Sequence, residues 1–300
     1  MHDVIVYTGS LKDQRSSRKL DVLLAFADGA KAQGANVLVE RNHVWQPSKL
    51  AVILGWPSPE QKGANIRFRA AVVENQQRFK QHVMAIDAGC FKFHDPDSKY
   101  LRYSINGVFY DRSEYANTDS GPERWNLISQ ELNLDINPWR ANKGNHILML
   151  LQRDGGWSMK GMHPVEWAQQ KIQQVKALTN MPIILRPHPG KVADVRDLCD
   201  RQVSVSDSIR TPLQHDLKRA RAALVFNSSS GVAAILNGVP LFVDDSSSVC
   251  WNVANHDLNQ LLTPSCVDRS QWIYNLAAAH WSDDEARSGA IYQKFLPYLA

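Results

Sequence analysis

Short apolar runs alternate with longer amphipathic stretches along most of this chain. The runs that read as strands lie at residues 3–10, 35–40, 49–56, 83–89, 146–152, 181–189, 222–227 and 239–245. Helical periodicity falls between and after them, at residues 19–34, 65–82, 164–179, 192–201, 212–220, 228–238, 269–281 and 282–299. Strands that alternate with helices at this spacing are typical of parallel α/β sheets.

The alternation stops between residues 91 and 137, a segment rich in Tyr, Asp, Ser and Gly with a helical pattern only at residues 123–133. Pro138 and Gly144 then interrupt the chain before the second series begins. We therefore expect an α/β protein with two Rossmann-like domains facing across a cleft. The expected boundaries are residues 1–140 for the N-terminal domain and 141–300 for the C-terminal domain, with the irregular segment as an insertion near an active site.

Composition narrows the class of protein. With 300 residues, 44% hydrophobic and 21% charged, the chain has enough apolar side chains for a core. Its four cysteines are widely spaced without a CxxC pair, which favours reduced thiols in a cytoplasmic protein, the host cytoplasm if the gene belongs to a phage. No apolar run is long enough to span a membrane. The formal charge of +4 permits an anionic partner without requiring one.

Three strand ends in the second half carry polar groups suited to an anion. The carboxyl ends of parallel strands meet at one edge of a sheet, where ligands bind. Arginine offers a planar fork to phosphate oxygens, and a helix N-terminus offers free N–H groups that a glycine lets an anion approach. The alternative for the serines is simple helix capping. The candidate phosphate-binding residues are Gln152, Arg153, Arg186, His188, Ser228, Ser229, Ser230 and Gly231.

Several other site classes lack their motifs. The chain has no GxGxxG for a dinucleotide, no GxxxxGK[ST] for a P-loop and no GxSxG nucleophile elbow. It has no HExxH or similar metal spacing, so no metal is expected. The anion that remains is the diphosphate of a nucleotide sugar or a related activated donor.

The motif "RPHPG", followed by "FNSSSGVAAILNGVPLFVDD", resembles the C-terminal half of GT-B glycosyltransferases. It is similar to the capsule-polysaccharide and Kdo-transferase-like group, and "SVCWNVANHDL" with "DRSQWIYNLA" also resembles phage glycosyltransferases that modify DNA bases. The resemblance covers roughly residues 145 to 280. It implies that the phosphate-binding residues above hold a nucleotide-sugar donor, expected to be UDP-linked, without a cofactor or metal. The helix at residues 228–238 lacks the Glu that many GT-B enzymes use for the ribose.

The acceptor side falls to the first half. Asp87 ends an apolar strand and is the candidate general base for an acceptor hydroxyl, the alternative being a turn cap. Candidates for contacts with acceptor or sugar are Ser10, Trp56, Arg102 and Trp251. For these the alternatives are a turn cap at Ser10, packing of the two tryptophans and a plain hairpin around Arg102.

The sequence therefore predicts a glycosyltransferase that moves a sugar from a nucleotide-sugar donor to a hydroxyl. A hydroxymethylated DNA base is one acceptor, favoured by basic clusters at residues 12–19 and 62–80, and a surface polysaccharide is another. A sugar-nucleotide epimerase using His215 and Asp216 stays open. So does a non-catalytic protein that binds nucleotides or nucleic acid. The oligomeric state is left open.

Overall fold

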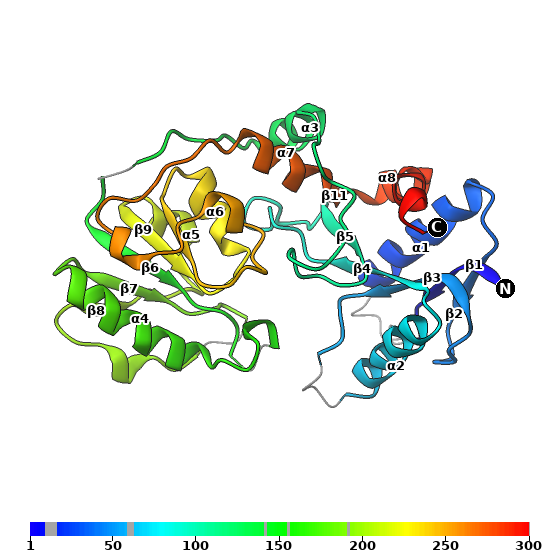
Figure 1. Ribbon diagram of the computed structural model, residues 1–300, viewed down its shortest axis with the longest axis horizontal. Helices are drawn as coiled ribbons and strands as arrows, with labels where there is room; N and C mark the ends of the chain where they lie inside the picture. The colour runs from blue at the N-terminus through cyan, green and yellow to red at the C-terminus, as the bar shows by residue number, and fades with distance from the viewer. Residues whose placement is uncertain (10–16, 59–62, 141–142, 155–156, 191–192, 300) are drawn as a thin grey trace. The chain divides into compact units, whose positions relative to one another are not determined.

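The computed structural model describes residues 1–9, 17–58, 63–140, 143–154, 157–190 and 193–299 (Figure 1). The chain is an α/β protein with two sheets, and its contacts divide it into two compact units. Unit 1 comprises Met1–Trp125 together with Ile273–Ala300, and unit 2 comprises Asn126–Trp272. Each unit carries a Rossmann-like sheet, as the alternating pattern predicts. No helix in the described ranges is long and apolar enough to cross a bilayer.

Unit 1 is built on a six-stranded sheet in the order β11-β5-β4-β3-β1-β2. Strands β1 to β4 are parallel, β5 pairs antiparallel with β4, and β11 pairs antiparallel with β5 at the edge of the sheet. The strands are β1 His2–Tyr7, β2 Val37–Glu40, β3 Ser48–Leu54, β4 His82–Asp87, β5 Leu101–Ile105 and β11 His280–Trp281. The helices are α1 Ser17–Ala32, α2 Ala64–Arg78, α8 Asp283–Ser288 and α9 Ala290–Phe295. Helices α3 Glu123–Leu132 and α7 Ser270–Ala278 contain the two points where the chain passes between units.

Both faces of the sheet in unit 1 are buried. Along β1, Val4 and Val6 join the cluster that includes α1, α8 and α9, whereas Ile5 and Tyr7 join the cluster on the α2 side. This period-two alternation is what a strand imposes on its side chains. Helices α1 and α8 approach so closely that a Cβ on Gly29 would lie 1.9 Å from the carbonyl oxygen of Ala286.

Unit 2 has a five-stranded parallel sheet in the order β10-β9-β6-β7-β8. Its strands are β6 His146–Leu150, β7 Ile183–Arg186, β8 Val203–Val205, β9 Ala220–Val225 and β10 Leu241–Val243. Its helices are α4 Pro164–Leu178, α5 Leu213–Leu217 and α6 Ser230–Leu236. Trp167 and Ile172 of α4 pack on Ile147 and Met149 of β6, which places α4 over one face of the sheet.

The structure divides the chain differently from the expected single boundary at residue 140. The C-terminal segment returns to unit 1, because His280 of β11 pairs with Arg102 of β5 and Glu285 of α8 forms an ion pair with Arg124. The expected linker also packs on unit 2, where the backbone N–H of Asn137 donates to the Leu236 carbonyl at 2.9 Å. A second domain at residues 141–300 is thus replaced by a unit that begins and ends earlier.

Three elements differ from the periodicity. Strand β5 lies in the segment predicted to be an irregular insertion, and β11 replaces the end of a predicted helix. The predicted helix at residues 192–201 is reduced to a single 3₁₀ turn at Arg196–Leu198, after which β8 begins at Val203. Strands of two to five residues pair with distant segments, so local periodicity is too short to reveal them.

His280 is fully buried and bonded at both ring nitrogens, since Nδ1 lies 2.7 Å from the Leu276 carbonyl and Nε2 accepts from the Cys90 N–H at 2.8 Å. Burial lowers the pKa of this imidazole to about 3, from an ordinary value of 6.5. Between pH 6.5 and about pH 3, the imidazole of His280 is therefore protonated in the unfolded chain and neutral in the folded chain. Its contribution to stability is complete above about pH 6.5 and declines as the pH falls toward 3.

We expect His280→Gln to flatten the loss of stability of the protein between pH 6.5 and pH 4, because glutamine does not titrate, while lowering stability at pH 7.5 through poorer packing. Urea unfolding at a series of pH values measures both effects. His2→Gln, at an exposed histidine, is the control and should leave the pH dependence unchanged. An identical slope for wild type and His280→Gln would contradict the assignment.

Candidate functional site

The strand order of unit 2 creates a switch point at the carboxyl ends of β6 and β9. Strands β7 and β8 lie on one side of β6, whereas β9 and β10 lie on the other. The loops that follow β6 and β9 therefore lead in opposite directions along the sheet, and ligands bind at such a point in open parallel sheets. Residues just beyond these two strands are the first candidates for a ligand site.

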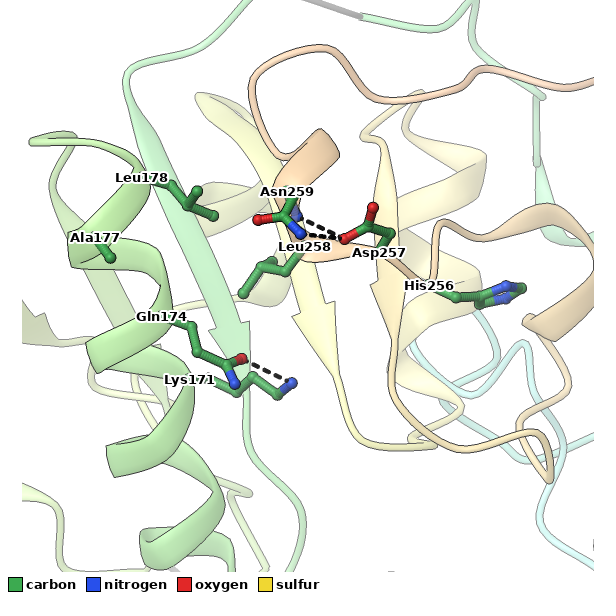
Figure 2. A pocket seen from close by; sticks show the side chains of 8 residues that line it. All are labelled: Lys171, Gln174, Ala177, Leu178, His256, Asp257, Leu258 and Asn259. Carbon is green, nitrogen blue, oxygen red and sulfur yellow. Dashed lines mark hydrogen bonds between the residues drawn. The ribbon is translucent and has the colours of Figure 1, made fainter.

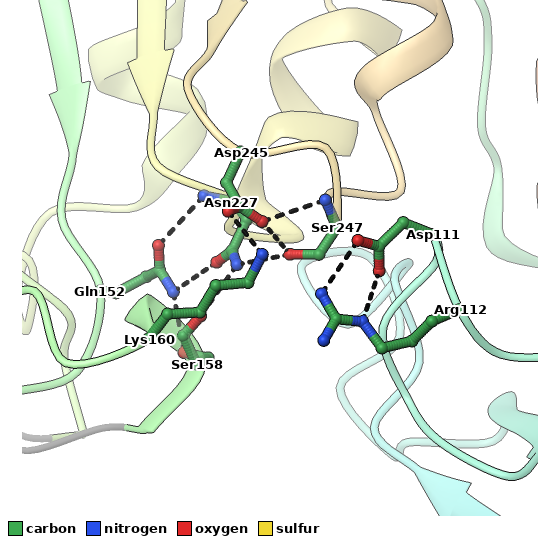
Figure 3. Close-up of polar contacts among 8 residues, drawn as sticks. All are labelled: Asp111, Arg112, Gln152, Ser158, Lys160, Asn227, Asp245 and Ser247. Carbon is green, nitrogen blue, oxygen red and sulfur yellow. Dashed lines mark hydrogen bonds and ion pairs between the residues drawn. The ribbon is translucent and has the colours of Figure 1, made fainter.

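Two side-chain amides join the strand ends at this switch point (Figure 3). Gln152, beyond β6, donates from Nε2 to Oδ1 of Asn227 at 2.7 Å, and Gln152 Oε1 accepts from the Asn227 N–H at 3.2 Å. Gln152 also donates to the Ser158 hydroxyl at 2.8 Å, and Asn227 Nδ2 donates to the Ser158 carbonyl at 2.8 Å. The sequence motif points to Gln152, and Asn227 proves to be its main partner.

The network continues past Asn227 into the loop after β10. Asn227 Nδ2 lies 2.9 Å from the Ser247 hydroxyl, which is bonded to Asp245, and Lys160 forms an ion pair of 2.7 Å with Asp245 (Figure 3). Burial opposes ionisation of Asp245, but the hydrogen bonds from Lys160 and Ser247 outweigh it and hold the pKa of this carboxyl below its ordinary value. We call Gln152, Asn227, Ser158, Ser247, Asp245 and Lys160 the edge network.

Lys160 is a residue that the sequence reasoning missed. Its backbone has φ = 54° and Gly161 follows with φ = 86°, two consecutive left-handed residues at the end of the loop before α4. A non-glycine side chain in this region is uncommon and tends to occur at functional positions. The sequence signal was the Lys-Gly pair in "WSMKG", which carries a cation into a turn. Its ammonium-bearing side chain is 36% exposed.

The serine-rich turn does not form the expected open helix terminus. The hydroxyls of Ser228 and Ser230 bond to each other at 2.8 Å, and the Ser229 side chain makes no capping bond at the start of α6. Gly231 is buried and packs against β10, since a Cβ there would lie 2.7 Å from a methyl group of the Leu241 side chain. The expectation that Gly231 opens the backbone to an anion is corrected accordingly. Ser228 and Ser229 remain half-buried beside the edge network.

Arg186 is a second correction. It is the last residue of β7 and is only 8% exposed, and its guanidinium forms an ion pair of 2.6 Å with the buried Asp216. The other terminal nitrogen donates to the Thr211 carbonyl at 2.8 Å. Because its two terminal nitrogens bond to Asp216 and to the Thr211 carbonyl, the guanidinium does not present its fork to a phosphate. We therefore assign Arg186 a structural role at the carboxyl edge of the sheet.

His188 and Arg153 lie together outside the sheet. The Gly190 N–H donates to Nδ1 of His188 at 2.9 Å, which leaves Nε2 as the protonated nitrogen of the neutral ring. A Cβ built on Gly190 would lie 2.8 Å from the Arg153 guanidinium, so this arginine reaches across the turn after β7. Arg153 is exposed and His188 half-buried. These two side chains stay in place as candidate phosphate contacts.

A pocket of about 420 Å³ opens at the carboxyl ends of β7 and β8. We call it the strand-end pocket. Its lining combines apolar side chains with two carboxylates, an arginine and two serine hydroxyls, and Ile209 at its wall is 72% exposed. Such a mixture suits a flat ring with polar edges. The lining residues are Pro187, Ala193, Asp194, Val195, Arg196, Val205, Ser206, Asp207, Ser208 and Ile209.

A second pocket of about 420 Å³ lies between α4 and residues 256–259 (Figure 2). Its polar groups already bond to one another or to close neighbours. Lys171 lies 3.1 Å from the Gln174 amide oxygen and 2.8 Å from Asp244, and Asp257 accepts from the N–H of Asn259 at 3.0 Å. The polar groups of the strand-end pocket also bond to close neighbours, Asp194 to Arg196 and Asp207 to the Ile209 N–H, but that pocket lies at the carboxyl ends of parallel strands, where ligands bind. Nearby, the ring of Trp251 stacks on His256 with centroids 3.6 Å apart.

The candidates in unit 1 gather around the end of β4. Asp87 is 35% exposed, and one of its oxygens accepts from Arg102 at 2.9 Å. Arg102 is held between this carboxylate and the ring of Tyr115, whose centroid lies 5.7 Å away. Burial raises the pKa of Tyr115 to about 12, so the phenol stays neutral. Arg102 thus supports Asp87 instead of reaching out to an acceptor, which corrects its predicted contact.

The remaining candidates are less informative. Trp56 packs against the apolar cluster on the α2 side of the sheet, in line with its packing alternative. Ser10 lies outside the described residues. Within the described part of the chain, no three His, Cys, Asp or Glu side chains come together to form a metal site.

Comparison with known proteins identifies the fold. No protein-family model and no curated protein sequence matches the chain. Two solved structures from Thermosulfurimonas dismutans are similar over almost its whole length. One is the KpsC beta Kdo 2,4 transferase, with 14% identity and a TM-score of 0.60 over 93% of this chain and 90% of that one. The other is the KpsC beta Kdo 2,7 transferase, with 13% identity and a TM-score of 0.54 over 97% and 99%.

The chain therefore has the GT-B glycosyltransferase-like fold that "RPHPG" and "FNSSSG" predict. At identities this low, the likeness concerns the arrangement of helices and strands. Activity, donor and acceptor have to be argued from the residues of this chain.

Asn227→Ala tests the edge network. The change removes three side-chain hydrogen bonds, one of them from the buried Gln152 amide, so the free energy of unfolding should fall by about 1–3 kcal/mol. Urea denaturation gives the value. Asn259→Ala, at an exposed amide in the second pocket, is the control and should cost no more than about 0.5 kcal/mol. Equal losses in the two variants would show that Asn227 has no special place in the unit.

Proposed function

We propose that this chain is a glycosyltransferase that binds a nucleotide-sugar donor at the carboxyl edge of unit 2 and transfers the sugar to a hydroxyl acceptor. The observation that carries the proposal is the alignment of the strand-end pocket and the edge network along that one edge, on a GT-B-like fold. The pocket, then Arg153 and His188, then the amides of Gln152 and Asn227 follow one another from β8 to β9, in the order in which a nucleotide sugar presents base, phosphates and sugar.

The strand-end pocket is the proposed place for the nucleoside. Pro187, Val205 and Ile209 offer apolar surface to a base, while Asp207 and the neighbouring serines offer polar groups to its edge or to the ribose. This supplies a candidate for the nucleoside contact that a helix-borne Glu makes in many GT-B enzymes and that the sequence of this chain lacks. A UDP-linked sugar is the first donor to test.

Arg153, His188 and Lys160 are the proposed phosphate contacts. Arg153 and His188 lie at the turn after β7, beside the strand-end pocket, and Lys160 lies at the far side of the switch point. Ser228, Ser229 and Ser230 keep their proposed role as donors of further hydrogen bonds. As the bond between sugar and phosphate breaks, the phosphate oxygen leaves with the bonding electron pair. Fixed cations then stabilise the charge that develops.

The edge network is suited to the sugar itself. Gln152, Asn227 and Asp245 present amide and carboxylate groups, which bond sugar hydroxyls well, and they are already held by one another. On unit 1, Asp87 remains the proposed base: it would accept the proton of the acceptor hydroxyl as the oxygen attacks the anomeric carbon. Arg102 keeps that carboxylate in one orientation. Trp56 and Trp251 remain candidates for contacts with acceptor or sugar.

A saccharide and a hydroxymethylated DNA base are the two acceptors to distinguish. A panel of UDP-, CMP-, ADP- and GDP-sugars, each with a saccharide acceptor or with hydroxymethylated DNA, decides between them by the release of free nucleotide. Release that depends on an acceptor supports transfer. Conversion of the sugar without acceptor would point to an epimerase, and no turnover with any donor would leave a binding protein.

Asp87→Asn tests the base. Asparagine keeps the shape and can still accept from Arg102, but it cannot take a proton. We expect turnover to fall by roughly 100-fold or more, while the donor dissociation constant stays at its wild-type value. Asp3→Asn changes another carboxylate of unit 1, one paired with Lys49, and should leave turnover unchanged. Wild-type turnover in Asp87→Asn would remove this residue from the mechanism.

Lys160→Met tests the phosphate contact. Loss of a charge-assisted bond should raise the dissociation constant of a nucleoside diphosphate by about ten-fold and leave that of the free nucleoside unchanged. Calorimetric titration of both ligands makes the comparison. Lys176→Met, which removes a surface lysine paired with Asp200, serves as the matched control. Equal weakening of nucleoside and nucleoside diphosphate would rule out a phosphate contact at Lys160.

A further inference from the structure

The buried ion pair of Arg186 and Asp216 lies behind the wall of the strand-end pocket, next to the lining residues Pro187 and Ser206. Arg186 ends β7 and Asp216 lies in α5, and the two side chains are 8% and 5% exposed. Their contact of 2.6 Å is joined by the Ser206 hydroxyl, which donates to the same carboxylate oxygen at 2.7 Å. Residues 186, 206 and 216, from three separate positions along the chain, therefore meet at one carboxylate.

Arg186 also holds the backbone of the loop between β8 and α5. Its second terminal nitrogen donates to the carbonyl of Thr211 at 2.8 Å, with a longer contact of 3.4 Å to the carbonyl of Ser208. Within the loop, Asp207 folds the chain into a turn by accepting from the N–H groups of Ile209 and Arg210, both at 3.1 Å. The Ser206 N–H donates to the Leu185 carbonyl of β7 at the start of the loop, and Arg186 attaches the turn that follows through the Ser208 and Thr211 carbonyls.

The same loop supplies Ser206, Asp207, Ser208 and Ile209 to the strand-end pocket, and Pro187 next to Arg186 lines it as well. Arg186 itself does not line the pocket and lies behind the residues that do. A wall attached in advance costs a ligand less ordering entropy on binding than one that must be ordered by the ligand.

We infer that Arg186 is a positioning residue that sets the affinity of the strand-end pocket by fixing residues 206–211. The inference rests on the proposed function of this pocket as the nucleoside site. Arginine is required because one planar guanidinium serves a carboxylate with one nitrogen and backbone carbonyls with the other. A lysine ammonium on this stem can keep the ion pair with Asp216 but cannot span both sides.

The buried charges themselves are replaceable. A buried ion pair gains little net stability over well-packed apolar side chains of similar volume, because both charges lose their hydration. The double variant Arg186→Met with Asp216→Leu should therefore fold, yet it has no donor for the Thr211 and Ser208 carbonyls. This separates the stability of unit 2 from the attachment of the loop.

The experiment measures dissociation constants of UDP, CMP, ADP and GDP by calorimetry, together with kcat and KM for the donor that is turned over. For the nucleotide that binds the wild-type protein, we expect the dissociation constant to rise by about ten-fold in Arg186→Lys and in the double variant. The KM for the donor should rise in parallel while kcat stays within about two-fold, since chemistry at the saturated site is untouched. Melting temperatures identify any loss of folding.

Arg140→Met is the matched control. Arg140 also donates to two backbone carbonyls of unit 2, those of Leu217 and Lys218 at the other end of α5, without touching residues 206–211. It should lower the melting temperature without changing nucleotide affinity.

Wild-type affinity in Arg186→Lys and in the double variant would overturn the inference while leaving the proposed function standing. Weakening in Arg140→Met as large as in Arg186→Lys would also overturn it, because the effect would then follow global stability. Absence of nucleotide binding by the wild-type protein would mean failure of the proposed function, and of the inference with it.

Discussion

The carboxyl edge of unit 2 depends on one interaction, the pair of amides that Gln152 and Asn227 form where β6 and β9 end. Parallel strands leave polar backbone and loops at this edge, and the switch in strand order pulls the two loops apart. The two amides connect the loop after β6 to the loop after β9, since each side chain both donates and accepts hydrogen bonds. Ser158 and Ser247 then extend the network into the loops after β6 and β10. The edge is thus held in shape without a ligand.

Cations on this edge fall into two groups that differ by burial. Arg186 is still part of a strand and faces the interior, where a carboxylate and two carbonyls take up its donors. Arg153 and Lys160 lie in loops beyond the strand ends and keep part of their surface in solvent. We propose that the second group contacts the donor phosphates and that Arg186 positions residues 206–211. A short difference in chain position, inside or just outside the sheet, decides which role an arginine has.

The alternation of apolar and polar positions was enough to predict most strands, the Rossmann-like units and, with the motifs after β7 and β9, the GT-B fold. It could not show that Arg186 has a partner, because Asp216 lies 30 residues further along the chain. Gln152 and Asn227 are separated by 75 residues, and only the parallel pairing of β6 with β9 brings them together. Gly231 looked like a backbone opening because its neighbour Leu241 on β10 cannot be inferred from local pattern. The same reason explains why the expected boundary at residue 140 differs from the observed units. Strand β11 pairs with β5, which lies far away in the sequence, and no local pattern indicates this pairing.

The central claim is that the carboxyl edge of unit 2 binds the nucleotide of the donor. Hydrogen exchange of the chain, followed by mass spectrometry with and without the nucleoside diphosphate that binds it, tests nucleotide binding at this edge most directly. The account predicts slower exchange in peptides covering residues 187–190 and 205–211, with a smaller effect at 157–163. Protection confined to residues 171–178 and 256–259, around the second pocket, or to unit 1, would contradict it.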